Sequence, residues 1–257
     1  MKNTPEKNIQ IPRNVILFNC SVPQIGYISR TSTIGKEFDM VNQYVDFLIK
    51  KYSKCKSKKA AIFIEPQIDT GYPDIVIVEF YSVPNLSWDK TRNSLTTTDL
   101  KILFYIQKQK KSSTKQISDI LGFPTDIVRK SLLRLFNCGL IYLSDDKNNA
   151  SNVYFRKYCR INKIIAIEAK IDKWHEAIRQ ASNNIWFSTE SYILLNKDSC
   201  SSTIIDTCSS DGLGIILVNG KIQTTLASTK RCIPVSYASI QFNEWILRWI
   251  HTEEMDI

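Results

Sequence analysis

The sequence predicts an α/β fold in which a mixed sheet is flanked by helices and interrupted by an inserted helical domain. Short apolar runs rich in Ile and Val alternate with amphipathic stretches in residues 1–93 and 159–257. Residues 94–158 instead contain closely spaced amphipathic helices followed by a hairpin with a polar tip. We therefore expect one discontinuous domain, 1–93 with 159–257, that carries 94–158 as an insertion.

Composition excludes several classes of protein. The chain has 257 residues, of which 43% are hydrophobic and 23% charged, as in ordinary globular proteins. It lacks an apolar run of the roughly 20 residues that cross a bilayer, and its start lacks the apolar core of a signal peptide. Seven scattered cysteines without C-x-x-C spacing and only two histidines argue against zinc sites and disulfides. We expect a cytoplasmic protein that does not associate with membranes.

Positive charge is concentrated in the expected insertion. Residues 94–158 contain 11 Lys and Arg against 5 Asp and Glu, a net charge of +6, whereas the other 192 residues contribute +3 to the total of +9. This asymmetry indicates a polyanionic partner for the insertion. The alternative is that the charge serves solubility alone.

One helix and three strands are expected before the insertion. Apolar residues recur at helical spacing over 36–52, and Glu37 lies in the first turn, where the helix dipole favours an acid. Asp74 stands at the entry of the third strand, on the face of Val76 and Val78. Closing the preceding turn is the commoner role of such an aspartate. The strand candidates are 15–18, 60–68 and 75–81.

The insertion resembles a winged helix-turn-helix domain. Its expected helices begin at Thr96, Ser112 and Thr125, the third is closed by Gly139, and the hairpin follows. Such domains usually place the third helix in the major groove of duplex DNA. Solvent-exposed charge and protein binding are the alternative roles of these side chains. The residues expected to contact DNA are Arg129, Lys130 and Arg134 on the third helix and Lys147 at the tip of the wing.

The stretch Ile164–Ile171, I-I-A-I-E-A-K-I, places two charges in an apolar strand. Alternate strand residues share a face, so Glu168 and Lys170 stand side by side, roughly 6.5 Å apart. Burying both charges costs on the order of several kcal/mol unless each has a partner. An internal ion pair is the simplest explanation of an isolated E-x-K.

The remaining residues return to alternating helices and strands. A helix is expected over 171–184, with Gln180 at the border of its apolar face. Asn219–Gly220 is a strong hairpin signal. Two strands and a final amphipathic helix are expected over 191–196, 203–207 and 239–251.

Taken together, Pro73–Asp74, Glu168-x-Lys170, Glu37 on the preceding helix and Gln180 on the following one resemble the PD-(D/E)xK nuclease superfamily, in particular its Mrr-type branch. The resemblance implies a restriction-endonuclease-like fold and a Mg²⁺ ion, replaceable by Mn²⁺, bound by Asp74 and Glu168. In that family the acid on the first helix, here Glu37, often joins the metal shell. Lys170 would position or activate the attacking water, and Gln180 would orient that water or bind phosphate. A surface amide is the alternative for Gln180.

The chain departs from the family pattern in two ways. Asp74 and Glu168 are 94 residues apart, which an insertion at a hairpin tip explains, and such an insertion would place a DNA-binding module beside the active face. Asn184 stands where one branch of the family has tyrosine. Three other acids could compete for a role in the site and are set aside only because of their strand positions: Glu65, Asp69 and Glu79. A different strand register would bring Glu79 into the site.

These observations favour a Mg²⁺-dependent DNA endonuclease whose insertion recognises or positions duplex DNA. A cutter of both strands would be expected to act as a homodimer. The alternative is a DNA-binding regulator built on a catalytically inert nuclease-like core, and a weaker one is a scaffold whose insertion binds protein.

Overall fold

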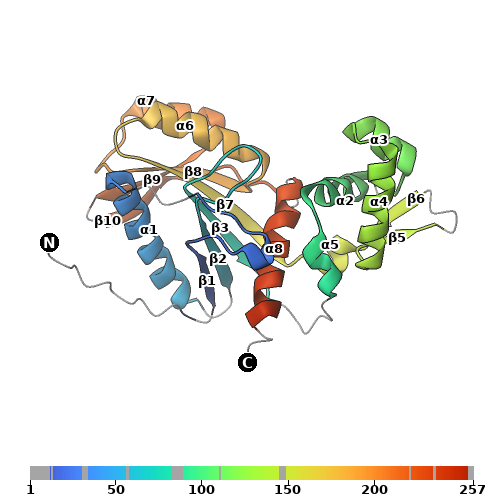
Figure 1. Ribbon diagram of the computed structural model, residues 1–257. Coiled ribbons are helices and arrows are strands. Elements are labelled where there is room, and N and C mark those ends of the chain that lie inside the picture. Colours follow the sequence, from blue (N-terminus) through green and yellow to red (C-terminus); the bar gives the residue numbers. More distant parts are fainter. Residues whose placement is uncertain are drawn as a thin grey trace.

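A seven-stranded mixed sheet runs through the larger part of the molecule (Figure 1). The computed structural model describes residues 12, 14–30, 34–55, 58–82, 89–109, 111–144, 149–219, 221–233 and 236–253. The central strands β2, β3 and β7 form an antiparallel set, β1 is parallel to β2, and β8 and β9 continue in parallel from β7. The strands, in spatial order, are β1 (Val15–Phe18), β2 (Lys59–Ile64), β3 (Ile75–Phe80), β7 (Ile161–Lys170), β8 (Glu190–Leu195), β9 (Gly214–Asn219) and β10 (Lys221–Leu226).

Helices cover both faces of this sheet. Helix α1 (Lys36–Ser53) packs its apolar stripe on one face, against β2 residues such as Ile62. On the other face, α8 (Tyr237–Glu253) packs on Phe63, the next residue of β2. Helices α6 (Trp174–Asn183) and α7 (Ser202–Asp211) cover β8 and β9 on the face of α8. The predicted mixed sheet flanked by helices is therefore confirmed. None of the described helices is long and apolar enough to cross a membrane.

One of the expected strands is a helix. Residues 203–207 lie within α7, where Ile204 and Cys208 are four residues apart and both buried. That spacing places them on one helical face, against β8 and β9. The β-branched Thr and Ile of this stretch suggested a strand, but packing decides the conformation and overrides so weak a preference.

Between β3 and β7 the chain forms a second, smaller unit with its own hydrophobic core. Its order is helix, strand, two helices and a hairpin, and its sheet has the order β4-β6-β5. The strand β4 was not expected, because its residues, Lys-Ser-Ser, are polar. The elements are α2 (Thr97–Gln109), β4 (Lys111–Ser113), α3 (Thr114–Leu121), α4 (Thr125–Asn137), β5 (Ile141–Leu143), β6 (Asn149–Asn152) and α5 (Tyr154–Lys157).

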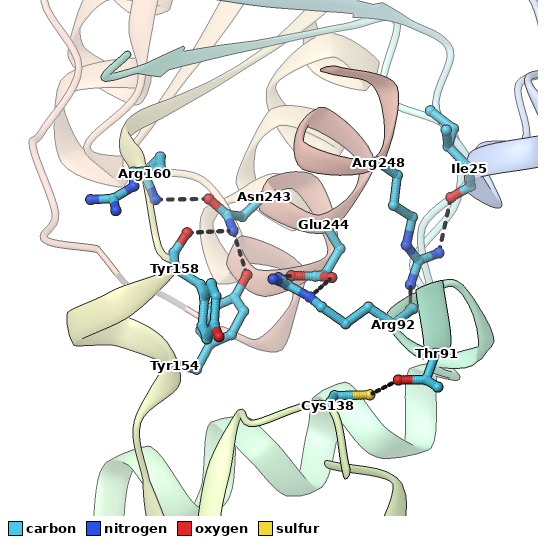
Figure 2. Close-up of polar contacts among 10 residues, drawn as sticks. All are labelled: Ile25, Thr91, Arg92, Cys138, Tyr154, Tyr158, Arg160, Asn243, Glu244 and Arg248. Carbon is cyan, nitrogen blue, oxygen red and sulfur yellow. Dashed lines mark hydrogen bonds and ion pairs between the residues drawn. The ribbon is translucent and has the colours of Figure 1, made fainter. Parts of the chain in front are cut away.

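A buried polar interface joins this unit to the body through α8 (Figure 2). Arg92, in the short helix η2 (Lys90–Ser94), forms an ion pair of 2.5 Å with Glu244, and both side chains are almost fully buried. Asn243 donates to the Tyr158 carbonyl and accepts from the backbone N–H of Arg160. Buried hydrogen bonds thus join the two sides of the interface. The insertion is held against α8 by these contacts as well as by the two chain segments that connect it to the sheet.

Candidate active site

The antiparallel pairing of β3 and β7 brings the predicted acids and the lysine together. Ile75 at the start of β3 lies opposite Ile167, so Asp74 comes next to the E-x-K segment. Asp74 Oδ2 accepts a 2.7 Å hydrogen bond from the backbone N–H of Ala169. The Lys170 ammonium lies 3.9 Å from the same oxygen. Residues separated by 94 positions in the sequence therefore meet at one end of the sheet.

Glu37 reaches the site from the first turn of α1. Its Oε2 lies 3.4 Å from Lys170 Nζ, which also donates to the Ala169 carbonyl at 3.0 Å. The Glu37 side chain is half-exposed, whereas Lys170 is largely buried. Lys170 is thus held between two carboxylates and a carbonyl, and its position is fixed.

Asn184 holds the second acid of the E-x-K motif. Its Nδ2 donates a 2.6 Å hydrogen bond to Glu168 Oε1, and both side chains are buried. Asn184 opens the short helix η3 (Asn184–Trp186) directly after α6. At the sequence level it counted only as a departure from the family pattern. In the structure it orients a site carboxylate.

Gln180 faces the same region from α6. It lines a depression of about 230 Å³ together with Glu168 and Asn184. Its Oε1 atom is buried and has no hydrogen-bond partner among the described residues. A buried amide oxygen without a partner is costly and is available to a bound water or ligand.

Glu65, which was set aside at the sequence level, belongs to the site. It directly follows β2 with a positive φ of 46°, is buried, and forms an ion pair with the guanidinium of Arg30. A small cavity of about 60 Å³ is lined by both residues and by Asp74 and Lys170. Counting strand positions could not place Glu65, because the chain leaves strand geometry at this residue.

The other rival side chains lie elsewhere. Glu79 sits near the far end of β3 and accepts hydrogen bonds from the Tyr52 hydroxyl and the Lys58 ammonium. Asp69 forms an ion pair of 2.8 Å with Lys101 of α2. Both acids are therefore accounted for outside the candidate site.

Burial dominates the electrostatics of the two central acids. It raises the pKa of Glu168 to about 8; the charge of Asp74 adds to this rise, whereas Asn184 and Lys170 oppose it. Burial also raises the pKa of Asp74, against the opposing effects of Lys170 and the Ala169 N–H. Two carboxyls crowded in a dry site with a single close ammonium are stabilised by an added cation.

The residues present fit Mg²⁺. Asp74 and Glu168 offer hard oxygen donors side by side, and Mg²⁺ is typically bound by one or two carboxylates with waters and phosphate oxygens filling the other positions. No group of three His, Cys, Asp or Glu within the described ranges is arranged to enclose a metal by itself. Asp74 and Glu168 would hold the ion. Glu37, which contacts Lys170, would join only through water or after moving.

The raised pKa of Glu168 has a measurable consequence for the metal-free protein. The folded carboxyl keeps its proton up to about pH 8, whereas in the unfolded chain its pKa is near 4.5. The folded state thus binds more protons in this window, so the free energy of unfolding falls as pH rises, by up to about 1.4 kcal/mol per unit. Thermal unfolding in EDTA should show that stability falls more steeply between pH 5 and pH 8 for wild type than for Glu168→Gln. An equal fall in stability for the two proteins would contradict this expectation.

The residues expected to contact DNA have different environments. Arg129 and Lys130 are exposed on α4. Arg134 donates to the buried Asp99 carboxylate at 2.7 Å, while 37% of its side chain stays exposed, so its contact with DNA remains a prediction. The sequence could not reveal this pairing, because Asp99 lies 35 residues away on α2. Lys147 lies outside the described residues.

The position of the insertion also differs from the expectation. It leaves the sheet after Phe80 and returns at Ile161, at the end of the β3–β7 pair opposite Asp74. Six strand residues separate the two ends, roughly 20 Å. Helix α2 comes back toward the site, through the contact of Lys101 with Asp69 in the loop that precedes Asp74.

Comparisons with protein-family models, with curated proteins and with solved structures give no match to this chain.

Proposed function

We propose that this protein is a Mg²⁺-dependent DNA endonuclease of the PD-(D/E)xK type. The observation that carries the proposal is the meeting of Asp74, Glu168 and Lys170 at one end of the sheet, where a buried carboxyl and a largely buried one face one ammonium. An ordinary internal ion pair needs one acid for each base. The second acid, with its costly burial, is accounted for if a cation binds between the two.

The order of elements supports a restriction-endonuclease-like core. Helix α1, the antiparallel strands β2, β3 and β7, helix α6 and the parallel strand β8 follow one another once the insertion is removed. This is the order that the resemblance implies, with each motif residue on its expected element. Proteins of one fold differ in activity, so the proposal depends on the site rather than on this likeness.

The side chains of the site would have different roles in phosphodiester hydrolysis. When bound, Mg²⁺ would lower the pKa of a water and offset negative charge on the phosphate. Gln180 would accept a hydrogen bond from the attacking water through its unpartnered Oε1. The water oxygen attacks phosphorus while the bond to the leaving sugar oxygen breaks. Lys170, fixed by Glu37 and the Ala169 carbonyl, stabilises the negative charge of the pentavalent transition state.

The direct experiment is incubation of supercoiled plasmid with the purified protein in Mg²⁺ or in EDTA. Nicked or linear DNA is expected only with Mg²⁺. Linear DNA as the first product would indicate paired cuts, as expected of a homodimer, and nicked circles would indicate single cuts. Absence of cleavage with Mg²⁺ and with Mn²⁺, on any form of DNA, would reject the proposal.

The insertion would act as a winged-helix module that binds duplex DNA. Its two exposed basic residues on α4, Arg129 and Lys130, are the proposed phosphate or base contacts. Replacing both with alanine should weaken duplex binding and reduce the slope of log Kd against log salt by about 2. Fluorescence anisotropy at several salt concentrations measures both effects. The cleavage rate at saturating DNA should stay unchanged, because neither residue is in the candidate active site.

A specific observation favours protein binding as the second candidate for the insertion. Beside the basic residues, the exposed surface of α4 and β5 includes four large apolar side chains: Ile127, Leu133, Phe136 and Tyr142. Three of the four lie on α4, and several large exposed apolar side chains on one helix often mark a protein interface. A DNA affinity that does not change with salt or with the double replacement would favour this candidate.

A further inference from the structure

Arg30 lies at the centre of the candidate active site, although nothing in its sequence context points to it. Three neighbouring depressions open at this end of the sheet, and Arg30 lines all of them. The first also contains Glu37 and Lys170, the second Glu168, and the third Asp74. Among the described residues, Arg30 is therefore the cation that all three depressions share.

The backbone of Arg30 is fixed by a short two-stranded ribbon. Its N–H donates to the Glu65 carbonyl at 3.1 Å, and the N–H of Gln67 donates to the Ile28 carbonyl at 2.8 Å. A bridge between Ser29 and Pro66 completes the pairing. This ribbon continues directly from β2, so the position of Arg30 follows from the sheet itself.

The guanidinium is fixed as well, but it is not enclosed. It forms an ion pair with Glu65 and lies over the ring of Tyr72, 5.8 Å from the ring centroid. The Arg30 side chain nevertheless keeps 46% of its surface exposed. A guanidinium has five N–H donors, so those not used by Glu65 are left for a ligand in the depressions.

Glu65 is suited to position the Arg30 side chain. Its backbone has a left-handed conformation, which is uncommon for residues other than glycine and costs about 1 kcal/mol or more. In that conformation the buried carboxylate meets Arg30 with one oxygen, while the other has no hydrogen-bond partner among the described residues. A residue retained in this conformation beside a charged site is typical of functional positions.

We propose that Arg30 binds a non-bridging oxygen of the DNA phosphate at the candidate active site and that Glu65 positions Arg30 for this contact. The inference rests on the proposed function and extends it to a residue outside the motif. A phosphate is the ligand that best fits a planar, preorganised guanidinium with free donors, because the two can form paired hydrogen bonds. The acids in the depressions, including Glu37 and Glu168, repel a phosphate, and a guanidinium fixed beside them adds to Lys170 in offsetting that repulsion.

Kinetics and binding together test the inference. Arg30→Ala is expected to lower the single-turnover cleavage rate by about 10²-fold, as for loss of one preorganised donor to the transition state. The Kd for duplex DNA in EDTA should rise only about threefold or less, because many other phosphate contacts remain. Guanidinium ion added to Arg30→Ala should restore part of the rate. Glu65→Gln should lower the rate by about tenfold with Kd unchanged, through a misplaced Arg30.

Lys58→Ala is the matched control, because it also removes a half-exposed cation paired with a buried acid, Glu79, but at the far end of β3, so the cleavage rate should stay unchanged. A second readout does not need cleavage: duplex DNA in EDTA should protect Arg30 from phenylglyoxal, as read by mass spectrometry. If wild type cuts DNA and Arg30→Ala, folded by circular dichroism, cuts equally fast, the inference is wrong. If wild type cuts nothing, the proposed function fails, and protection of Arg30 still decides whether it binds phosphate. If Arg30→Ala does not fold, Arg30→Lys replaces it, with a rate loss of at least about tenfold expected.

Discussion

Replacing Lys170 with alanine is expected to lower Mg²⁺-dependent DNA cleavage by about 10³-fold. The lysine is held by Glu37 at 3.4 Å and by the Ala169 carbonyl at 3.0 Å, so its charge is already in position before substrate binds. Preorganised charges of this kind act mainly on the transition state, because they need no rearrangement when charge develops. DNA affinity in EDTA should change little, and single-turnover plasmid cleavage together with anisotropy would separate the two effects.

Lys163→Ala is a matched control on the same strand. Lys163 is also partly buried and forms an ion pair, with Glu190 at 2.8 Å, but it lies toward the opposite end of β7. Loss of Lys163 should leave the cleavage rate of the folded protein within about threefold of wild type, since it removes only one distant charge. Equal losses in the two variants would mean that Lys170 acts through stability rather than through chemistry.

Replacing Glu244 with alanine is expected to lower the free energy of unfolding by about 3–5 kcal/mol. The Arg92 guanidinium would then remain buried at the interface between α8 and the insertion without its carboxylate partner, now 2.5 Å away (Figure 2). Both side chains are only 1–2% exposed, so water cannot replace the lost contact. Chemical denaturation would measure the change, and the melting temperature should fall by at least about 6 °C.

Two comparisons separate the loss of the pair from the loss of an acid. The double variant Arg92→Met with Glu244→Leu should be more stable than Glu244→Ala, because it does not leave the Arg92 charge buried without its partner. Lys101→Ala, which breaks the half-exposed pair with Asp69, should cost less than about 1 kcal/mol. A Glu244→Ala protein as stable as wild type would show that this interface does not hold the insertion.

The sequence was sufficient to predict the sheet and the meeting of the three central side chains of the candidate site. Alternation in β3 and β7 puts Asp74, Glu168 and Lys170 on one face, and only antiparallel pairing of two strongly apolar strands is needed to bring them together. Helices α1, α6 and α8 likewise follow from local patterns. Gly220 lies outside the described residues, but the strands on either side of the Asn219–Gly220 signal, β9 and β10, pair antiparallel as expected.

Side-chain positions that depend on tertiary contacts could not be predicted from local sequence patterns. Arg30 and Glu65 lie outside regular strands, and their pairing depends on the ribbon after β2 and on a left-handed backbone that no local pattern signals at a glutamate. Asn184 acquires its role only because η3 turns it back onto Glu168. Arg134 looked like an exposed basic residue, but its partner lies on another helix.

Diffraction from crystals soaked in Mn²⁺, with anomalous data collected at the manganese edge, tests the proposed metal site most directly. The proposed site requires an anomalous peak about 2.1 Å from one oxygen of Asp74 and one of Glu168, with Lys170 close but not bound to the ion. The peak should disappear in Glu168→Gln crystals. If no ion binds to Asp74 and Glu168 at saturating Mn²⁺, the proposed metal site is contradicted, and with it the proposed nuclease function.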